Sequence, residues 1–131
     1  MKNFFLCLLL ILFTTATYCQ IDKPLKFNTS LVTFYTKGDS KWEVKSKMDL
    51  EQIVVIDASN KKIKILDPVN TVEFDILNIE NEILKGDIKK YPFNCVDDDG
   101  NKCIVEVILV KERFSTVRVK HDFVIMDLSA K

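Results

Sequence analysis

The residues with the clearest chemical potential lie in one short stretch, Cys95-Val96-Asp97-Asp98-Asp99-Gly100-Asn101-Lys102-Cys103. Asp98-Asp99-Gly100 fits a three-residue hairpin loop in which Gly100 adopts the left-handed conformation of a G1 bulge. Cys95 then lies directly opposite Cys103. Opposed residues of a non-hydrogen-bonded pair have Cβ atoms close enough for a disulfide. We therefore expect Cys95 and Cys103 to form a disulfide across a β-hairpin.

The loop of this hairpin also offers oxygen atoms to a cation, from Asp97, Asp98, Asp99 and Asn101. In the register of an EF-hand, however, the first ligand would be Cys95, which supplies no hard oxygen atom. A weak cation site is therefore the alternative to an acidic, solvated turn. We predict no cofactor.

Catalytic groups are scarce in this sequence. The single histidine, His121, lies beside Asp122 in a predicted turn, and a Ser-His-Asp unit would need a serine from elsewhere in the chain. A nucleophilic cysteine needs a thiolate, which the expected disulfide removes. A zinc site that combines His121 with the two cysteines would lack a fourth ligand. We predict that the protein is not an enzyme.

The first nineteen residues have the pattern of a secretory signal peptide. Lys2 supplies a positive charge, and an unbroken apolar run follows from Phe4 to Phe13. This run is too short to span a membrane, and small residues follow it, so we expect cleavage before Gln20. The alternative is a lipoprotein acylated at Cys19, against which Tyr18 argues. The expected location is secreted or periplasmic, with no membrane span in the mature chain.

The mature chain would have 112 residues, the length of one domain. Without Lys2 it carries 18 basic and 19 acidic side chains, a net charge of about −1, so nothing favours nucleic acid as a partner. Cys7 and Cys19 belong to the leader, which leaves two cysteines to pair in an oxidising compartment. We assign residues 1–19 to the signal peptide, 20–30 to an N-terminal arm and 31–131 to a single domain.

Short strand patterns separated by turn signals fill this domain. We expect strands over residues 31–36, 41–48, 53–56, 62–66, 71–79, 91–97, 101–111, 114–120 and 123–128, and a loop over 80–90 that allows one more short strand. Nearly every connection suits a hairpin. The pattern predicts an all-β antiparallel meander of eight or nine strands that closes into a small barrel, with a β-sandwich as the alternative.

The alternation of residues assigns faces to these strands. In the strand over residues 41–48 we expect Trp42, Val44, Ser46 and Met48 to share a buried face, opposite a charged one. The unbroken apolar run over residues 53–56 predicts a strand covered on both faces. The aromatic residues either form the core or line a ligand site in the barrel, for which the candidates are Phe34, Trp42, Phe74 and Phe114.

A signal peptide, a glutamine at the mature start and an antiparallel meander over about residues 31–128 resemble small secreted bacterial proteins of the calycin or lipocalin-like kind. Lipocalins carry a Gly-x-Trp motif on their first strand. Here the only tryptophan is Trp42, on the second expected strand, with Gly38 four positions before it. The resemblance implies a non-enzymatic binding domain with a small apolar ligand inside the barrel. The alternative function is an envelope protein-interaction or structural module, or an inhibitor.

Overall fold

The computed structural model describes residues 23–39 and 41–130. The predicted signal peptide over residues 1–19, the cleavage before Gln20 and the alternative acylation of Cys19 lie outside the described residues. The predicted single domain over residues 31–131 lies within them except for residues 40 and 131.

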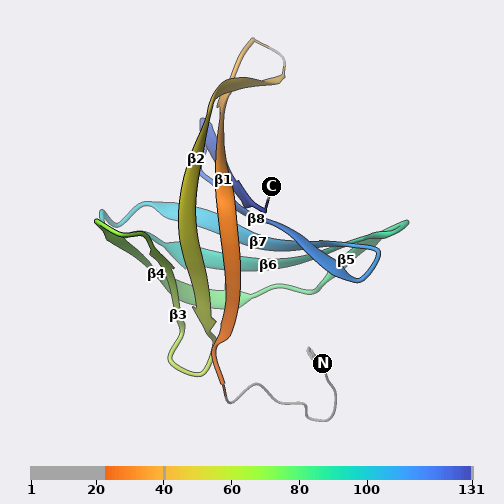
Figure 1. Ribbon diagram of the computed structural model, residues 1–131. Coiled ribbons are helices and arrows are strands. Elements are labelled where there is room, and N and C mark those ends of the chain that lie inside the picture. Colours follow the sequence, from red (N-terminus) through yellow and green to blue (C-terminus); the bar gives the residue numbers. More distant parts are fainter. Residues whose placement is uncertain (1–22, 40, 131) are drawn as a thin grey trace.

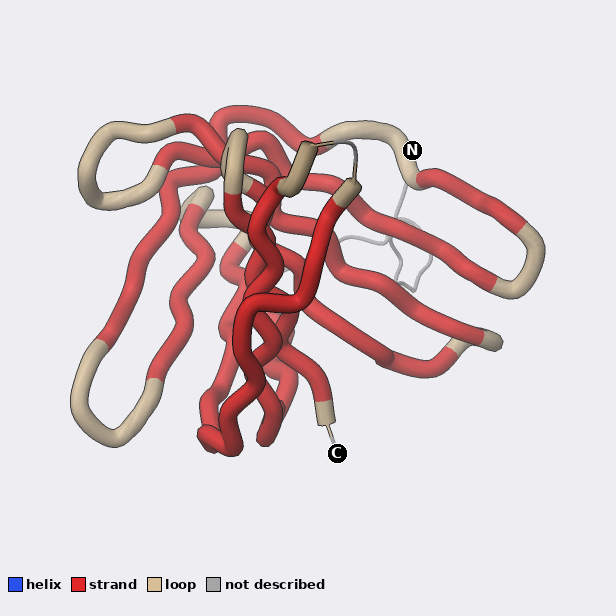
Figure 2. The backbone as a smooth tube through the Cα atoms, turned by 90° about the horizontal axis from the view of Figure 1, so that it is seen from above, coloured by secondary structure: helices blue, strands red, loops and turns tan. Residues whose placement is uncertain are grey.

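Nine strands joined by short loops make up nearly all of the described backbone (Figure 2). They are β1 (Leu25–Lys37), β2 (Trp42–Asp57), β3 (Lys62–Leu66), β4 (Thr71–Ile79), β5 (Ile83–Lys85), β6 (Ile88–Val96), β7 (Lys102–Val110), β8 (Arg113–Lys120) and β9 (Val124–Ser129). The short strand allowed within residues 80–90 is present as β5. The expected N-terminal arm is too long, because β1 already begins at Leu25 and pairs there with Ile56.

Eight of the strands form a closed antiparallel barrel (Figure 1). Consecutive strands pair within β1–β4 and within β6–β9. Two further pairings, of β4 with β6 and of β9 with β1, close the ring. The short strand β5 pairs only with the first residues of β6. The predicted meander and its closure into a barrel are thus confirmed.

Alternate residues of each strand fill the interior of the barrel. The core includes Ile63 and Ile65 of β3, as their alternation predicts, and Val105 of β7. The run over residues 53–56 is not covered on both faces, because Val54 and Ile56 are buried whereas Ile53 is exposed. In a small barrel each strand has one face toward the interior and one toward the surroundings.

The hairpin of β1 and β2 is longer than the rest of the barrel and extends beyond it (Figure 1). On one side of this hairpin, β9 pairs with β1 over Leu31–Thr36. On the other side, β3 pairs with β2 only over Ile53–Asp57. Among the described residues, the segment Trp42–Gln52 therefore has a strand neighbour on the β1 side only. We call this segment of β2 the open edge.

The predicted common face of the open edge is wrong, because a β-bulge interrupts the alternation. Ser46 lies opposite Phe34, but Val44 lies opposite Tyr35, so Lys45 is an extra residue in β2. Directly opposed residues point to the same side of a sheet. Ser46 thus shares the face of Phe34, which packs against the core, and Val44 shares the outer face with Tyr35. All residues from Trp42 to Asp49 are exposed, since no other layer covers them.

Candidate functional site

The hairpin at the tip of β6 and β7 has the predicted geometry. Gly100 has a φ of 85° and donates its N–H to the carbonyl of Asp97 at 3.0 Å. The N–H of Asp97 in turn donates to the carbonyl of Asn101 at 2.9 Å. This is a three-residue loop with a G1 bulge, and it places Cys95 directly opposite Cys103.

The disulfide itself is not formed in the structure, in which both cysteines are buried free thiols. The turn explains why. Asp97 and Asn101 form a hydrogen-bonded pair, so the pair two residues further along is again of the hydrogen-bonded kind, with its side chains further apart than we expected. The thiol of Cys95 donates to the carbonyl of Phe93 at 3.6 Å, along its own strand. The predicted register is confirmed, but the assumed type of pair is wrong.

Burial also makes these thiols poor nucleophiles. Burial, with a smaller contribution from the neighbouring Cys103, raises the pKa of Cys95 to about 12. Burial, with a smaller contribution from the charge of Asp97, raises the pKa of Cys103 to about 11. The thiolate is the reactive form of cysteine, so both side chains are protonated and unreactive near neutral pH.

The loop carboxylate of Asp97 holds the tip together and connects it to a second turn. Its Oδ1 accepts from the N–H groups of Asp99 at 3.0 Å and Asn101 at 2.9 Å. Its Oδ2 lies 3.0 Å from Nε2 of His121, so the histidine pairs with this residue rather than with Asp122 beside it. The hydrogen bond from the backbone N–H of Asn101 lowers the pKa of Asp97, and the contact with the side chain of His121 lowers it as well.

These contacts leave little for the predicted cation site. Both oxygens of Asp97 already accept hydrogen bonds within the chain, and Asp98, Asp99 and Asn101 are exposed. Within residues 23–39 and 41–130, no three His, Cys, Asp or Glu side chains are gathered so that they could hold a metal ion. The structure therefore gives the acidic loop a role in the turn and offers no support for a cation there.

The four aromatic residues predicted to line a ligand site lie in different places. Phe74 is buried in the core, while Phe34 and Phe114 are partly buried against it. Phe114 stacks on Phe27 with 4.6 Å between the ring centroids. Trp42 is exposed at the outer end of the β1–β2 hairpin. The structure does not gather the four around one space, and their contact with a ligand stays a prediction.

A surface hollow of about 530 Å³ lies where β1 and β2 leave the barrel. Its lining includes Gln52 and Ile53 of β2 and Leu66 and Pro68 at the end of β3, and none of the four predicted aromatic residues. The side-chain oxygen Oε1 of Gln52 is buried and accepts no hydrogen bond. This hollow therefore lies at the inner end of the open edge and contains an acceptor without a donor.

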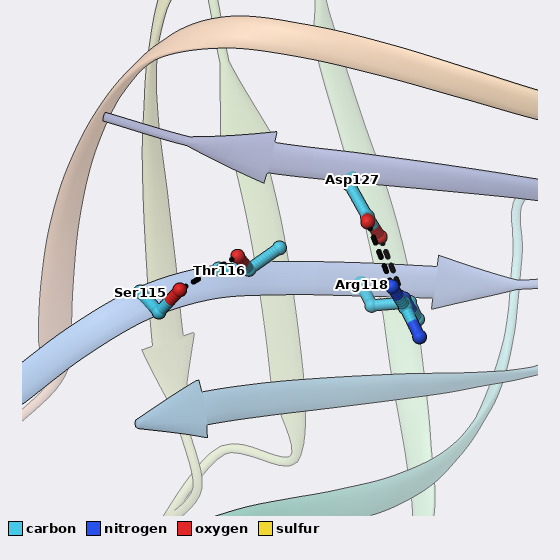
Figure 3. Close-up of polar contacts among 4 residues, drawn as sticks. All are labelled: Ser115, Thr116, Arg118 and Asp127. Atoms are coloured by element: carbon cyan, nitrogen blue, oxygen red, sulfur yellow. Dashed lines mark hydrogen bonds and ion pairs between the residues drawn. The ribbon is translucent and has the colours of Figure 1, made fainter. Parts of the chain in front are cut away.

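A row of polar side chains crosses the outside of the barrel. Directly opposed residues continue from one strand to the next, through Glu106 on β7, Arg118 on β8, Asp127 on β9, Thr33 on β1 and Lys47 on β2. At its centre Arg118 binds Asp127 with two bonds, Nε to Oδ1 at 2.7 Å and Nη2 to Oδ2 at 2.9 Å (Figure 3). The hydrogen bond and charge of Asp127 raise the pKa of Arg118.

Two features beside this pair were not predicted. Glu106 is only 6% exposed, and its Oε1 accepts no hydrogen bond, so a donor from outside the chain, water included, would satisfy it. A bulge at Ser115 brings its hydroxyl to 3.1 Å from that of Thr116, on the face of Arg118 (Figure 3). The only signal in the sequence was the acidic Glu106 in the middle of an apolar strand.

The open edge is the other candidate site, and its backbone geometry follows from β1. Lys37 donates its N–H to the carbonyl of Phe123 at 3.2 Å, so the odd-numbered residues of β1 direct their backbone groups toward β9. The even-numbered residues then face β2. On β2, Ser46 and Met48 therefore bond to β1, whereas Lys47 directs its N–H and carbonyl away from β1.

Comparisons with models of protein families, with curated proteins and with solved structures find no match for this chain. The fold defines its class: an eight-stranded antiparallel up-and-down β-barrel with one additional short strand. This architecture is consistent with the lipocalin-like layout expected from the sequence. Over the described ranges, no helix has the length and apolar character that crossing a membrane requires.

Proposed function

We propose that this protein is a secreted, non-enzymatic binding domain whose partner is a protein that adds an extended strand to the open edge. The observation that carries this proposal is the one-sided pairing of Trp42–Gln52 in an otherwise closed barrel. An exposed strand edge binds extended chains through main-chain hydrogen bonds and obtains specificity from alternate side chains.

The packing of the interior supports a site on the outside. Side chains such as Val54, Ile63, Val117 and Leu128 are completely buried there, and the aromatic Phe74 is buried among the same cluster. Apolar side chains that are buried together in this way stabilise the fold. It favours the protein-interaction alternative over a small apolar ligand in the barrel.

The outer end of the β1–β2 hairpin adds exposed apolar surface next to the open edge. Val44 is 55% exposed, and the aromatic rings of Trp42 and Phe123 are also exposed, on either side of Lys37. Aromatic side chains are enriched at protein interfaces relative to the remaining surface. An extended partner that lies along the open edge would meet this apolar end.

The proposal includes the compartment. Export with removal of residues 1–19 would place the domain outside the cytoplasm or in the cell envelope, as the apolar run and the small residues after it indicate. Amino-terminal sequencing of the exported protein tests this. A start at Gln20 is the expected result, and retention of the first nineteen residues would contradict export by cleavage.

The binding site is tested with a random peptide library selected on the exported protein. Lys47→Pro removes an N–H that faces away from β1, whereas Lys47→Ala keeps it. We expect Lys47→Ala to lose only the contribution of the lysine charge, and Lys47→Pro to bind the selected peptides at least tenfold more weakly than Lys47→Ala does. Asp49→Pro replaces Lys47→Pro if the latter melts at a lower temperature. Failure to enrich any peptide, or equal binding to all variants, would overturn the proposal.

A further inference from the structure

We propose that the strand received by the open edge is that of a second copy of this chain, paired antiparallel about a two-fold axis at Met48. This inference rests on the proposed function, because it names the partner of the same edge. The evidence is the order of charges along β2, the direction of its backbone groups and the position of the surface hollow.

The charges of the open edge are self-complementary. Lys45 and Lys47 precede Met48, and Asp49 and Glu51 follow it. When Met48 lies opposite Met48 of the second copy, Lys47 faces Asp49 and Lys45 faces Glu51. The two-fold axis repeats each pair. The two pairs of Lys47 with Asp49 lie in the regular part of the new ladder, and the two pairs of Lys45 with Glu51 lie at the bulges on either side of it. Directly opposed charges of opposite sign stabilise an antiparallel pair, and like charges destabilise it.

The backbone geometry selects this register among its neighbours. Lys47 and Asp49 direct their backbone groups away from β1, whereas Met48 bonds toward it. A shift by one residue would place Lys47 opposite Met48, whose groups point the wrong way. A shift by two residues would place Lys47 opposite Lys47, or Asp49 opposite Asp49, depending on its direction. Of these registers, only the Met48 register aligns the backbone groups and places no like charges opposite each other.

The surface hollow lies where the second copy would end. In the Met48 register, Val44 of the second copy faces Gln52, whose Oε1 is the buried acceptor without a donor. The residues before Val44 would then reach the hollow lined by Leu66 and Pro68. The pairing thus covers the inner end of the open edge as well as its middle.

The interface would be small. Bulges at Lys45 and beside Leu50 leave a regular stretch of β2 over residues 46–49. A short ladder with two regular charge pairs and little buried area is typical of weak dimers, and we expect a dissociation constant on the order of 10–100 µM. Such a dimer forms only where the protein is locally concentrated.

Analytical ultracentrifugation of the exported protein, from about 1 µM to about 500 µM, measures this dissociation constant. Lys47→Glu creates two like-charge pairs, and so does Asp49→Lys, so each variant alone should dimerise at least tenfold more weakly. An equimolar mixture of the two variants should restore the dimer as one copy of each. In this mixed dimer the two substituted side chains face each other with opposite charges, and the unsubstituted Lys47 of one copy faces the unsubstituted Asp49 of the other. Lys85→Glu, on the exposed strand β5, makes the same charge change away from the edge and should dimerise as the wild type does.

Weakened single variants together with recovery in their mixture support the second copy as partner. A wild type that stays monomeric throughout overturns it, and so does a dimer that Lys47→Glu leaves unchanged. Neither of these outcomes affects the proposed function, which the peptide selection with Lys47→Pro and Lys47→Ala tests independently. A peptide that Lys47→Ala still binds and Lys47→Pro does not, without any dimer, would show that the edge binds a different chain.

Discussion

Truncation of Leu128 tests whether the interior of the barrel is solid, on which the placement of the binding site on the outside depends. Leu128 lies on β9 between Val32 and Val117, and its exposed fraction is 0%. Leu128→Ala removes its buried methyl groups and leaves a cavity, because closed strands on both sides limit collapse. The expected loss in the free energy of unfolding is about 3–4 kcal/mol. That is a large part of the roughly 5–15 kcal/mol of a typical domain.

Urea unfolding followed by circular dichroism measures this loss. With an m-value of about 1.5 kcal/mol/M, the midpoint should fall by about 2–2.7 M at unchanged slope. Leu84→Ala is the matched control, because Leu84 on β5 is 62% exposed, and its effect should stay within about 0.5 kcal/mol. If Leu128→Ala costs less than about 1 kcal/mol, the leucine faces a space that is already empty. The apolar-ligand hypothesis would then regain its site.

Three further predictions concern the polar groups. Asp127→Ala leaves the partly buried Arg118 without its partner and should lower the free energy of unfolding by about 1–3 kcal/mol in urea, whereas Asp127→Asn, which keeps one acceptor, should cost less. Because the pKa of Asp97 in the folded state lies below its ordinary value of 3.8, its contribution to stability is complete above that value and is lost as the pH falls through the folded-state pKa. Asp97→Asn should therefore reduce the fall in melting temperature between about pH 4 and pH 2, and an unchanged pH profile would contradict this. The thiols of Cys95 and Cys103, buried and with raised pKa values, should react with a thiol reagent at neutral pH only after unfolding, and rapid labelling of the reduced, folded protein would contradict this. The mass of the unreduced exported protein tests the predicted disulfide, which would remove two hydrogen atoms.

Local turn chemistry made the hairpin of β6 and β7 predictable. Gly100 is the only residue of its loop that adopts a positive φ without steric cost, and this fixes which residues face each other across the strands. The same reasoning gave the strands, their short connections and the closure of the barrel. The turn also determines the type of pair that Cys95 and Cys103 form. Hydrogen-bonded and non-hydrogen-bonded pairs alternate along the ladder, and the pair of Asp97 with Asn101 is hydrogen-bonded, so the cysteine pair is hydrogen-bonded too.

The faces of β2 and the row of polar side chains on the outside of the barrel could not be predicted from the sequence, for a different reason. A bulge adds one residue to a strand without leaving a composition signal, and the one at Lys45 reverses the face of every residue before it. The contact of Arg118 with Asp127 depends on the register between two strands, as does the placing of Glu106 beside them. The contact between His121 and Asp97 forms because two turns that are far apart in the sequence lie next to each other in the fold, and the sequence alone does not show this.

The open edge follows from the lengths of the strands, and its composition decides what it accepts. β1 and β2 have 13 and 16 residues, whereas β3 has 5 and β9 has 6, so closing the barrel cannot cover the long hairpin. Lysines and bulges on an exposed edge usually discourage pairing with arbitrary strands. Lys45 and Lys47 do so for any strand that lacks opposed acidic residues. The same lysines favour a strand that carries acids at matching positions, and Asp49 and Glu51 supply these in the chain itself. Features that repel most partners thus select one.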